Sequence, residues 1–344
     1  MSLLVDFRKK SGNFYLDMNF ETDGDVLGLL GATGSGKSMV LKCIAGTEVP
    51  DEGKIILDGV TLFDSSHRIK LPAKKRNVGC LFRNHSLFPK MSVKQNILHG
   101  AKNRDFTECA FGEILDMLQL RGLENHRPSE LSKPQQQSVA LAQILAGGPS
   151  LLILDEPFSE LDTHLRGQAQ IQMQKLVKQF GKSVLIATHS RDEAYCLCSR
   201  IALVDDGKIL AFKKTKALFS DPESRQAAIM TGVKNIVDAK KIGEHELAIP
   251  AWGIRLTVEL PLRDELCAVA IRAHYFNTKT PHNRYNVNFV GRMEEPFEYI
   301  LQFRYENQDD SSPDIWWRLP KDKIGDKEPS ELGVAPQNVM PLYE

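Results

Sequence analysis

Apolar residues are distributed differently in two parts of the chain. Up to about residue 230, short and almost wholly apolar runs at 26–30, 151–154 and 184–188 alternate with segments of helical spacing at 111–120 and 139–146. Such runs suit strands that are buried on both faces of a parallel sheet. The alternation of strand and helix predicts an α/β domain.

The residue composition changes after residue 232. Segments rich in β-branched and aromatic residues occur at 268–272, 285–290, 299–305 and 315–319, and turn-prone stretches such as 307–314 separate them. This pattern predicts a small all-β domain. At about 150 residues per domain, a chain of 344 residues also corresponds to roughly two domains. We therefore expect one domain over residues 1–232 and a second over residues 233–344.

Composition and charge exclude several classes of protein. Hydrophobic residues make up 42% of the chain and charged residues 26%, which excludes a disordered chain, and no apolar run of 18 residues predicts a membrane span. The 44 basic and 44 acidic residues cancel. We therefore expect no nucleic-acid partner held through its phosphate backbone. The first ten residues lack the apolar segment of a secretory signal, so we do not expect secretion.

The six cysteines do not predict a disulfide framework or a zinc site. They include no CxxC pair and have no regular spacing with histidines. We interpret them as reduced thiols in mostly apolar surroundings.

The strongest local motif follows the apolar run 26–30 directly. It matches GxxxxGK[ST] and consists of Gly31, Ala32, Thr33, Gly34, Ser35, Gly36, Lys37 and Ser38. Glycines let the backbone approach a phosphate closely, and the helix that follows presents its positive end to the same anion. Lys37 is expected to reach the β- and γ-phosphates and Ser38 to bind Mg²⁺. A glycine-rich turn without a ligand is the disfavoured alternative.

Two further apolar runs end in polar residues. Asp155 and Glu156 follow residues 151–154, and His189 follows residues 184–188. In open parallel sheets, ligands bind at the carboxyl edge where such residues lie. Asp155 suits the Mg²⁺ shell, Glu156 suits the polarisation of an attacking water, and His189 suits donation to a developing phosphate charge. An acidic pair at this position is otherwise most often a helix cap.

Five ordered motifs together resemble the ATP-binding subunits of ABC transporters over about residues 3–230. They are the phosphate loop at 31–38, Leu-Ser-Lys-Pro-Gln-Gln-Gln at 131–137, Asp-Glu-Pro at 155–157, Ser-Glu-Leu-Asp at 159–162 and Thr-His at 188–189. Within the family, residues 12–14 and 69–76 look most like the ATPases that import molybdate. The tail, notably Ile-Arg-Ala-His at 271–274, resembles the small regulatory barrel called TOBE. The favoured interpretation of Arg272 and His274 is that they are strand residues without a ligand, and contact with an oxyanion is the alternative.

The resemblance implies a P-loop cassette with a helical subdomain, followed by a TOBE-like barrel of the oligonucleotide-binding type. It implies ATP and Mg²⁺ as cofactors and a second ATP-binding subunit, identical or paralogous, whose Ser132, Gln135 and Asp162 would close over each ATP. It further implies permease subunits that contact residues 83–91 through Leu87, Phe88 and Pro89, and an external solute-binding protein that acts indirectly. The expected location is the cytoplasmic face of the cell membrane.

Several residues depart from the family pattern. Lys133 and Pro134 replace the two glycines of Leu-Ser-Gly-Gly-Gln, and Arg83 replaces a glutamine that faces Mg²⁺. Proline has no backbone N–H, and arginine has no acceptor. Ser11 replaces an aromatic that stacks on adenine, which leaves Phe14 or Tyr15 as candidates. The milder departures are Ser138 and Glu160.

These departures leave alternatives open. We expect Mg·ATP binding with hydrolysis at a reduced rate in an importer of molybdate or a related oxyanion. Sulfate, polyamine, sugar and iron are the alternative solutes. The rival functions are an ATP-dependent binding switch with little turnover, a degenerate partner in a heterodimer, and a soluble ABC protein, which is disfavoured because one chain carries one cassette.

Overall fold

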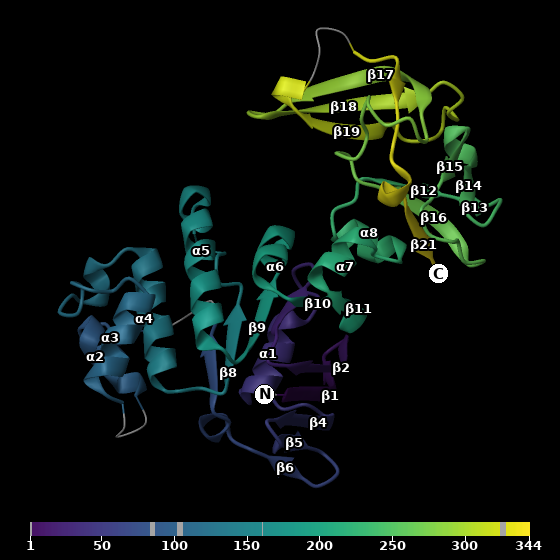
Figure 1. Ribbon diagram of the computed structural model, residues 1–344. Helices are drawn as coiled ribbons and strands as arrows, with labels where there is room; N and C mark the ends of the chain where they lie inside the picture. The colour runs from purple at the N-terminus through teal and green to yellow at the C-terminus, as the bar shows by residue number, and fades with distance from the viewer. Residues whose placement is uncertain (1, 83–86, 102–105, 160, 324–327) are drawn as a thin grey trace. The chain divides into compact units, whose positions relative to one another are not determined.

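The computed structural model describes residues 2–82, 87–101, 106–159, 161–323 and 328–344 (Figure 1). Its contacts divide the chain into two compact units, Met1–Thr215 and Lys216–Glu344. Each unit contains hydrophobic core clusters built from its own elements. Each is therefore large enough to fold around an interior of its own.

The strands of the first unit form one continuous sheet. They are β1 (Ser2–Ser11), β2 (Phe14–Asp23), β3 (Val26–Leu30), β4 (Glu52–Leu57), β5 (Val60–Asp64), β6 (Ile69–Lys70), β7 (Val78–Leu81), β8 (Leu151–Asp155), β9 (Ser183–Thr188), β10 (Arg200–Asp205) and β11 (Lys208–Lys214). Their order in the sheet is β6-β5-β4-β1-β2-β11-β10-β3-β9-β8-β7. The β1–β2 and β4–β6 strands pair antiparallel and form one end of this sheet.

The other end of the sheet is parallel and buried. β3 pairs in parallel with β10 and β9, β9 with β8, and β8 with β7. Every residue of β8 and β9 is buried, which agrees with the apolar runs that predicted these strands. The register sets Leu30 beside Thr188 and Asp155 beside Ala187. The carboxyl ends of β3, β8 and β9 therefore meet at one edge.

The helices of the first unit fall into two groups, one packed on the parallel strands and one packed on α4. They are α1 (Lys37–Ala45), α2 (Val93–Gly100), α3 (Glu108–Met117), α4 (Lys133–Ala146), α5 (Thr163–Phe180) and α6 (Arg191–Leu197), with 3₁₀ turns at Ala73–Lys75 and Pro128–Glu130. α1 contacts β8 and β9, whereas α2 and α3 pack against α4 (Figure 1). α2, α3 and α4 are the expected helical subdomain.

Two helix boundaries differ from the sequence expectation. α4 begins at Lys133, six residues before the apolar periodicity starts, because proline is well tolerated in the first turn of a helix. α3 ends at Met117, short of the expected residue 120, and Gln119 has a positive φ of 55° that a helix does not admit.

The second unit consists mainly of strands. Its sheets are β12 (Asn235–Asp238), β16 (Leu266–Ile271) and β21 (Met340–Tyr343); β13 (Lys240–Lys241), β14 (Glu246–Ile249) and β15 (Ile254–Thr257); and β19 (Ile315–Pro320), β18 (Glu298–Tyr305), β17 (Tyr285–Glu294) and β20 (Glu331–Leu332). The α7 (Thr215–Ser220) and α8 (Arg225–Met230) helices precede these strands, and 3₁₀ turns lie at Pro250–Trp252, Lys321–Lys323 and Pro336–Asn338. The α/β cassette followed by an all-β tail confirms the expected fold class.

Aromatic side chains fill the core of the second unit. Phe276 packs edge-on against Phe303, and Phe303 packs edge-on against Tyr305. In the part of the chain that the structure describes, no helix is long and apolar enough to cross a membrane.

Candidate functional site

The phosphate loop at residues 31–38 connects β3 to α1, as its sequence predicts. Gly31 approaches β10 so closely that a Cβ atom there would lie 2.2 Å from the Val204 carbonyl oxygen. Gly36 precedes α1 with φ of 101°, in the left-handed region that favours glycine. Two glycines of the motif are therefore required by geometry.

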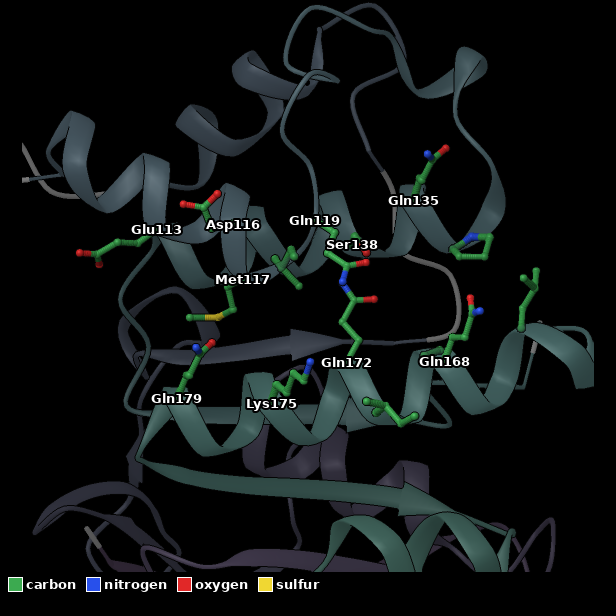
Figure 2. Close-up of a pocket in the computed structure, with 15 residues that line it drawn as sticks. Glu113, Asp116, Met117, Gln119, Gln135, Ser138, Gln168, Gln172, Lys175 and Gln179 are labelled. Atoms are coloured by element: carbon green, nitrogen blue, oxygen red, sulfur yellow. The ribbon is translucent and has the colours of Figure 1, made fainter.

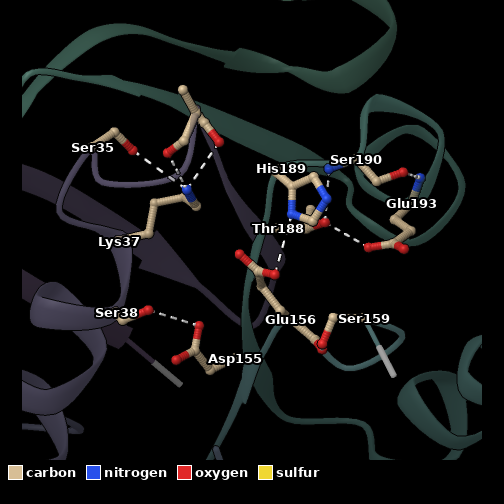
Figure 3. A network of polar contacts seen from close by, with 12 residues as sticks. Ser35, Lys37, Ser38, Asp155, Glu156, Ser159, Thr188, His189, Ser190 and Glu193 are labelled. Atoms are coloured by element: carbon tan, nitrogen blue, oxygen red, sulfur yellow. Dashed lines mark hydrogen bonds and ion pairs between the residues drawn. The ribbon is translucent and has the colours of Figure 1, made fainter. Parts of the chain in front are cut away.

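Lys37 is the buried cation of this loop, with 4% of its surface exposed. Its Nζ donates to the carbonyl oxygens of Gly31 at 2.9 Å and Ala32 at 2.7 Å, and to Ser35 Oγ at 3.4 Å (Figure 3). The loop thus holds an ammonium group beside the amino end of a helix. Together they form a site that favours an anion.

Ser38 and Asp155 meet below the loop although they are far apart in sequence. Ser38 Oγ donates to Asp155 Oδ1 at 3.1 Å, and Asp155 is buried at the end of β8 (Figure 3). A hydroxyl and a carboxylate supply oxygen atoms, which are the ligands that Mg²⁺ prefers. Two protein ligands are enough, because this ion usually completes its coordination with water and phosphate oxygens. The pair therefore fits Mg²⁺. Among the described residues, no cluster of three or more His, Cys, Asp or Glu forms a metal site.

Glu156 and His189 come from the ends of neighbouring strands. His189 Nδ1 lies 3.2 Å from Glu156 Oε2, and the Glu156 side chain is buried while the His189 side chain is half exposed (Figure 3). Glu156 has a positive φ of 48°. Its N–H donates to the Ala187 carbonyl at 2.8 Å, and its own carbonyl accepts from Ser159 Oγ at 3.0 Å. These bonds fix an unusual backbone conformation at the carboxylate.

Lys37, Ser38, Asp155 and Glu156 border one cavity of about 570 Å³, whose lining does not include His189. We call it the phosphate-loop cavity; its lining residues are Ser11, Phe14, Thr33, Gly34, Gly36, Lys37, Ser38, Met39, Lys42, Phe82, Asp155 and Glu156. Phe14 and Tyr15 are the two candidates for stacking on the adenine base. Phe14 lines this cavity, whereas Tyr15 does not line it and is 45% exposed. Ser11 and Phe14 are paired across the β1–β2 hairpin.

Ser132, Gln135 and Asp162 do not line the phosphate-loop cavity within one chain. The Ser132 N–H and Oγ both donate to Gln135 Oε1, at 2.9 Å and 3.1 Å. Asp162 is exposed and immediately precedes α5, where its carbonyl accepts from the backbone N–H groups of Leu165 and Arg166. The resemblance assigns these three residues to the nucleotide of a second copy.

A second cavity of about 1050 Å³ lies between α3, the start of α4 and α5. Pro134, Gln135 and Ser138 line it from α4, and Gln168 and Gln172 line it from α5 (Figure 2). Of the residues that depart from the family pattern, Lys133 begins α4, and Pro134 and Ser138 line the cavity next to α5.

The segment expected to contact a permease is described only in part. Arg83 and Glu160 lie outside the described residues. Phe88 is 39% exposed and packs edge-on against His99, with ring centroids 4.4 Å apart. Asn96, which is fully buried, accepts from the Phe88 N–H at 2.8 Å and donates to the Phe88 and Met91 carbonyls. Sequence reasoning missed Asn96, whose signal is a polar residue between the buried Val93 and Ile97.

In the second unit, Arg272 has local partners. Its guanidinium donates to the carbonyl oxygens of Thr231 at 3.0 Å and Phe219 at 2.5 Å. His274 packs edge-on against Tyr275, and burial lowers the pKa of its imidazole. Arg272 thus stabilises the connection to the strands.

The family model described as ABC transporter matches residues 16–159. The molybdate/tungstate import ATP-binding protein WtpC of Thermococcus kodakarensis is 35% identical over 269 residues, which cover 76% of this chain and 78% of the relative. The chain belongs to the ABC transporter family of ATP-binding proteins. The sequence resemblance is therefore confirmed.

Other relatives of this ABC protein carry different solute names. The spermidine/putrescine import ATP-binding protein PotA of Methylococcus capsulatus is 37% identical, over 69% of this chain and 63% of the relative. The molybdenum import protein ModC of Paramagnetospirillum magneticum is 35% identical, over 64% of this chain and 61% of the relative. The chain thus matches about three fifths of the length of these two relatives.

A solved structure resembles the cassette. It is a dimer of the ATP-binding cassette MJ0796 in a post-hydrolysis state, bound to ADP and Pi. It is 27% identical with a TM-score of 0.51, and the match covers 62% of this chain and 99% of that chain.

Proposed function

We propose that this chain is the ATP-binding and hydrolysing subunit of an ABC importer, which works as a dimer with membrane permease subunits at the cytoplasmic face. One observation carries the proposal. Beside the phosphate loop, Ser38 of α1 bonds to Asp155 at the end of β8, and the adjacent Glu156 pairs with His189, which follows the neighbouring strand β9. That arrangement provides an anion site, a magnesium ligand set and a proton acceptor in one place.

Each residue has a chemical role in this proposal. Lys37 and the loop N–H groups bind the phosphates, and Ser38 and Asp155 hold Mg²⁺, which would neutralise phosphate charge when bound. The Glu156 carboxylate orients the attacking water and accepts its proton. His189, whose Nδ1 lies 3.2 Å from Glu156 Oε2, donates a ring N–H to a phosphate oxygen.

We propose further that turnover is reduced by the altered signature. Pro134 cannot donate a backbone N–H to a phosphate. Losing one charge-assisted hydrogen bond costs about 1.5–3 kcal/mol, or about 10- to 200-fold in rate or affinity. Lys133 partly compensates as a cation next to the same position. A binding switch or a degenerate partner in a heterodimer is the second candidate function, and Pro134 is the observation that favours it.

The proposed solute is molybdate or a related oxyanion. The relatives with polyamine, sulfate, iron and molybdate names are 34–37% identical to this chain, so identity alone does not choose among them. The support for an oxyanion is the likeness of residues 12–14 and 69–76 to the molybdate importers, together with the alignment to the molybdate/tungstate relative over 76% of this chain. The molybdenum relative ModC aligns over 64%, and the polyamine, sulfate and iron relatives over 67–69%. Sulfate, polyamine, sugar and iron are the competing solutes.

The test of ATP hydrolysis is Glu156→Gln in the purified full chain. We expect phosphate release to fall by about a hundredfold or more, because the proton acceptor is lost while the phosphate site is kept. Binding of a fluorescent ATP analogue should be unchanged. Glu108→Gln, whose side chain is 87% exposed, is the control. A wild-type chain that binds ATP and releases no phosphate would support the binding switch instead.

The importer assignment needs a membrane measurement. Affinity purification from native membranes should recover an integral membrane partner with the chain. ATP turnover of that complex in vesicles should rise with a molybdate-loaded binding protein. A rise only with a polyamine- or sulfate-loaded protein would reject the oxyanion, and recovery without any membrane partner would favour the soluble ABC protein.

A further inference from the structure

A buried carboxylate lies behind His189. Glu193, in the first turn of α6, is 5% exposed, and neither the motif nor the cavity lining includes it. His189 itself projects toward Glu156 on the opposite side of the turn that follows β9 (Figure 3). Glu193 is therefore close to the catalytic edge without facing the phosphate-loop cavity.

Glu193 is bonded to the residues on both sides of His189. The Thr188 Oγ1 hydroxyl donates to Glu193 Oε2 at 2.5 Å, and Thr188 Oγ1 itself accepts from the Ser190 N–H at 3.0 Å (Figure 3). Ser190 Oγ in turn accepts from the Glu193 N–H at 3.3 Å. These three bonds close a ring around the backbone of His189. The orientation of the imidazole depends on this backbone.

The burial of Glu193 argues against a role limited to the helix end. An acidic residue in the first turn stabilises a helix through its dipole, but the neighbouring Asp192 is exposed and already supplies that charge. Burial raises the pKa of the Glu193 carboxyl, and the Thr188 hydrogen bond and the charge of Arg166 oppose that rise. In such surroundings, a hydrogen bond is stronger than one exposed to water, and its loss leaves a buried polar group unpaired.

We propose that Glu193 is a positioning residue, which sets the orientation of His189 through the Thr188 hydroxyl. The proposal rests on the proposed function, because His189 has a catalytic role only if the chain hydrolyses ATP. Glu193 touches neither the phosphates nor the attacking water. Its removal should therefore slow turnover and leave nucleotide binding intact.

The kinetic test compares three variants of the full chain. Glu193→Ala should lower kcat by about ten- to a hundredfold, the effect of a misplaced catalytic group, while the KM for Mg·ATP changes less than about twofold. Glu193→Gln retains an oxygen that accepts from Thr188 and should restore most of the turnover. Asp192→Asn is the matched control one residue away and should behave as wild type.

A spectroscopic readout separates positioning from stability. In nucleotide-free protein labelled at its histidines, the His189 ring resonance is assigned by its loss in His189→Gln. It should move in Glu193→Ala and in Thr188→Val, and keep its position in Glu193→Gln and Asp192→Asn. If Glu193→Ala does not fold, Thr188→Val, which removes only the hydroxyl, decides the same question.

The proposal is overturned if the His189 resonance and kcat stay at wild-type values in Glu193→Ala or Thr188→Val. It is also overturned if Asp192→Asn reproduces their effects. A wild-type chain without ATP turnover would defeat the proposed function, whereas the resonance of His189 would still decide whether Glu193 positions it.

Discussion

At the scale of single residues, Glu156 carries the carboxylate beside His189 on a strained, left-handed backbone. A left-handed conformation costs a non-glycine residue about 1–2 kcal/mol, and here the Ala187 carbonyl and the Ser159 hydroxyl hold it. The same turn directs the carboxylate toward His189. Strained backbone conformations of this kind cluster at functional sites, so the φ of Glu156 supports a functional role for its side chain.

The cysteines give a residue-scale prediction. Burial raises the pKa of the Cys43, Cys80 and Cys198 thiols to about 12, whereas Cys109 and Cys196 are exposed. At pH 8, only about one in ten thousand of a thiol with pKa near 12 is the reactive thiolate. Maleimide at pH 8 should therefore label Cys109 and Cys196 first, and the three thiols with a pKa near 12 only after denaturation.

Peptide mapping by mass spectrometry measures this order. Denatured protein is the control, since all six cysteines should then react. Labelling of Cys80 in the native protein as fast as Cys109 would contradict the prediction.

The candidate site residues could be predicted from the sequence where the parallel strands determine their position. Asp155, Glu156 and His189 follow apolar runs, and parallel strands bring their carboxyl ends to one edge, so their proximity could be inferred from the sequence. Glu193 and Asn96 were not predicted. Each is a polar residue on a helix, and only the packing of the turns beside it shows that it is buried and hydrogen-bonded to them.

At the scale of elements, the start of α4 explains the altered signature. Helix α4 begins at Lys133, and Pro134 occupies its first turn, where proline does not break a helix. The Lys-Pro pair therefore suits the helix while it removes a backbone donor at its amino end. In the proposed function, the stability of α4 and donation to a phosphate therefore favour different residues at this position.

That conflict can be tested by restoring the glycines. Lys133→Gly with Pro134→Gly should raise ATP turnover by about tenfold or more, because a backbone N–H returns. It should also lower the Tm, since glycine costs up to about 1 kcal/mol per helical position. Phosphate release and thermal melting measure the two effects.

Lys178→Gly with Gln179→Gly, in the last turn of α5, is the control for glycine in a helix. It should lower the Tm without raising turnover. If the double change at residues 133 and 134 gives no gain in turnover, the altered signature does not limit the rate.

The elements themselves were predictable to different degrees. The parallel strands β8 and β9 were evident because burial on both faces produces an uninterrupted apolar run. Strands β1 and β2 alternate buried and exposed residues, and the sequence expectation did not include them. The beginning of α4 was missed because its first turn is polar and lies outside the apolar periodicity.

At the scale of the whole molecule, zero net charge and a phosphate site are compatible. The 44 basic and 44 acidic residues give no long-range attraction for a polyanion. In the proposed function, a phosphate is bound locally, by Lys37 and the oriented N–H groups of the loop. Zero net charge therefore argues against a polyanionic macromolecular partner, but it does not argue for or against a nucleotide.

The beginning of the second unit has contacts that assign residues 216–232 to it. Ala228 and Val233 belong to the same core cluster as Ala268, Ala270 and Leu342. Arg272 donates to the carbonyl oxygens of Phe219 and Thr231 and lies over the Phe219 ring at 5.7 Å. Contacts across the described chain therefore favour a boundary at residue 216, whereas the change in residue composition along the sequence favours 233.

Two fragments distinguish these boundaries. A fragment of residues 216–344 should unfold at a higher temperature than one of residues 233–344, because the shorter fragment loses the Ala228 contacts and two acceptors of Arg272. The expected difference is about 2–4 kcal/mol in the free energy of unfolding. Arg272→Ala in the longer fragment should account for part of it, and Arg255→Ala is the control. Equal unfolding free energies would place the boundary at residue 233, with α8 contributing nothing to the stability of the all-β unit.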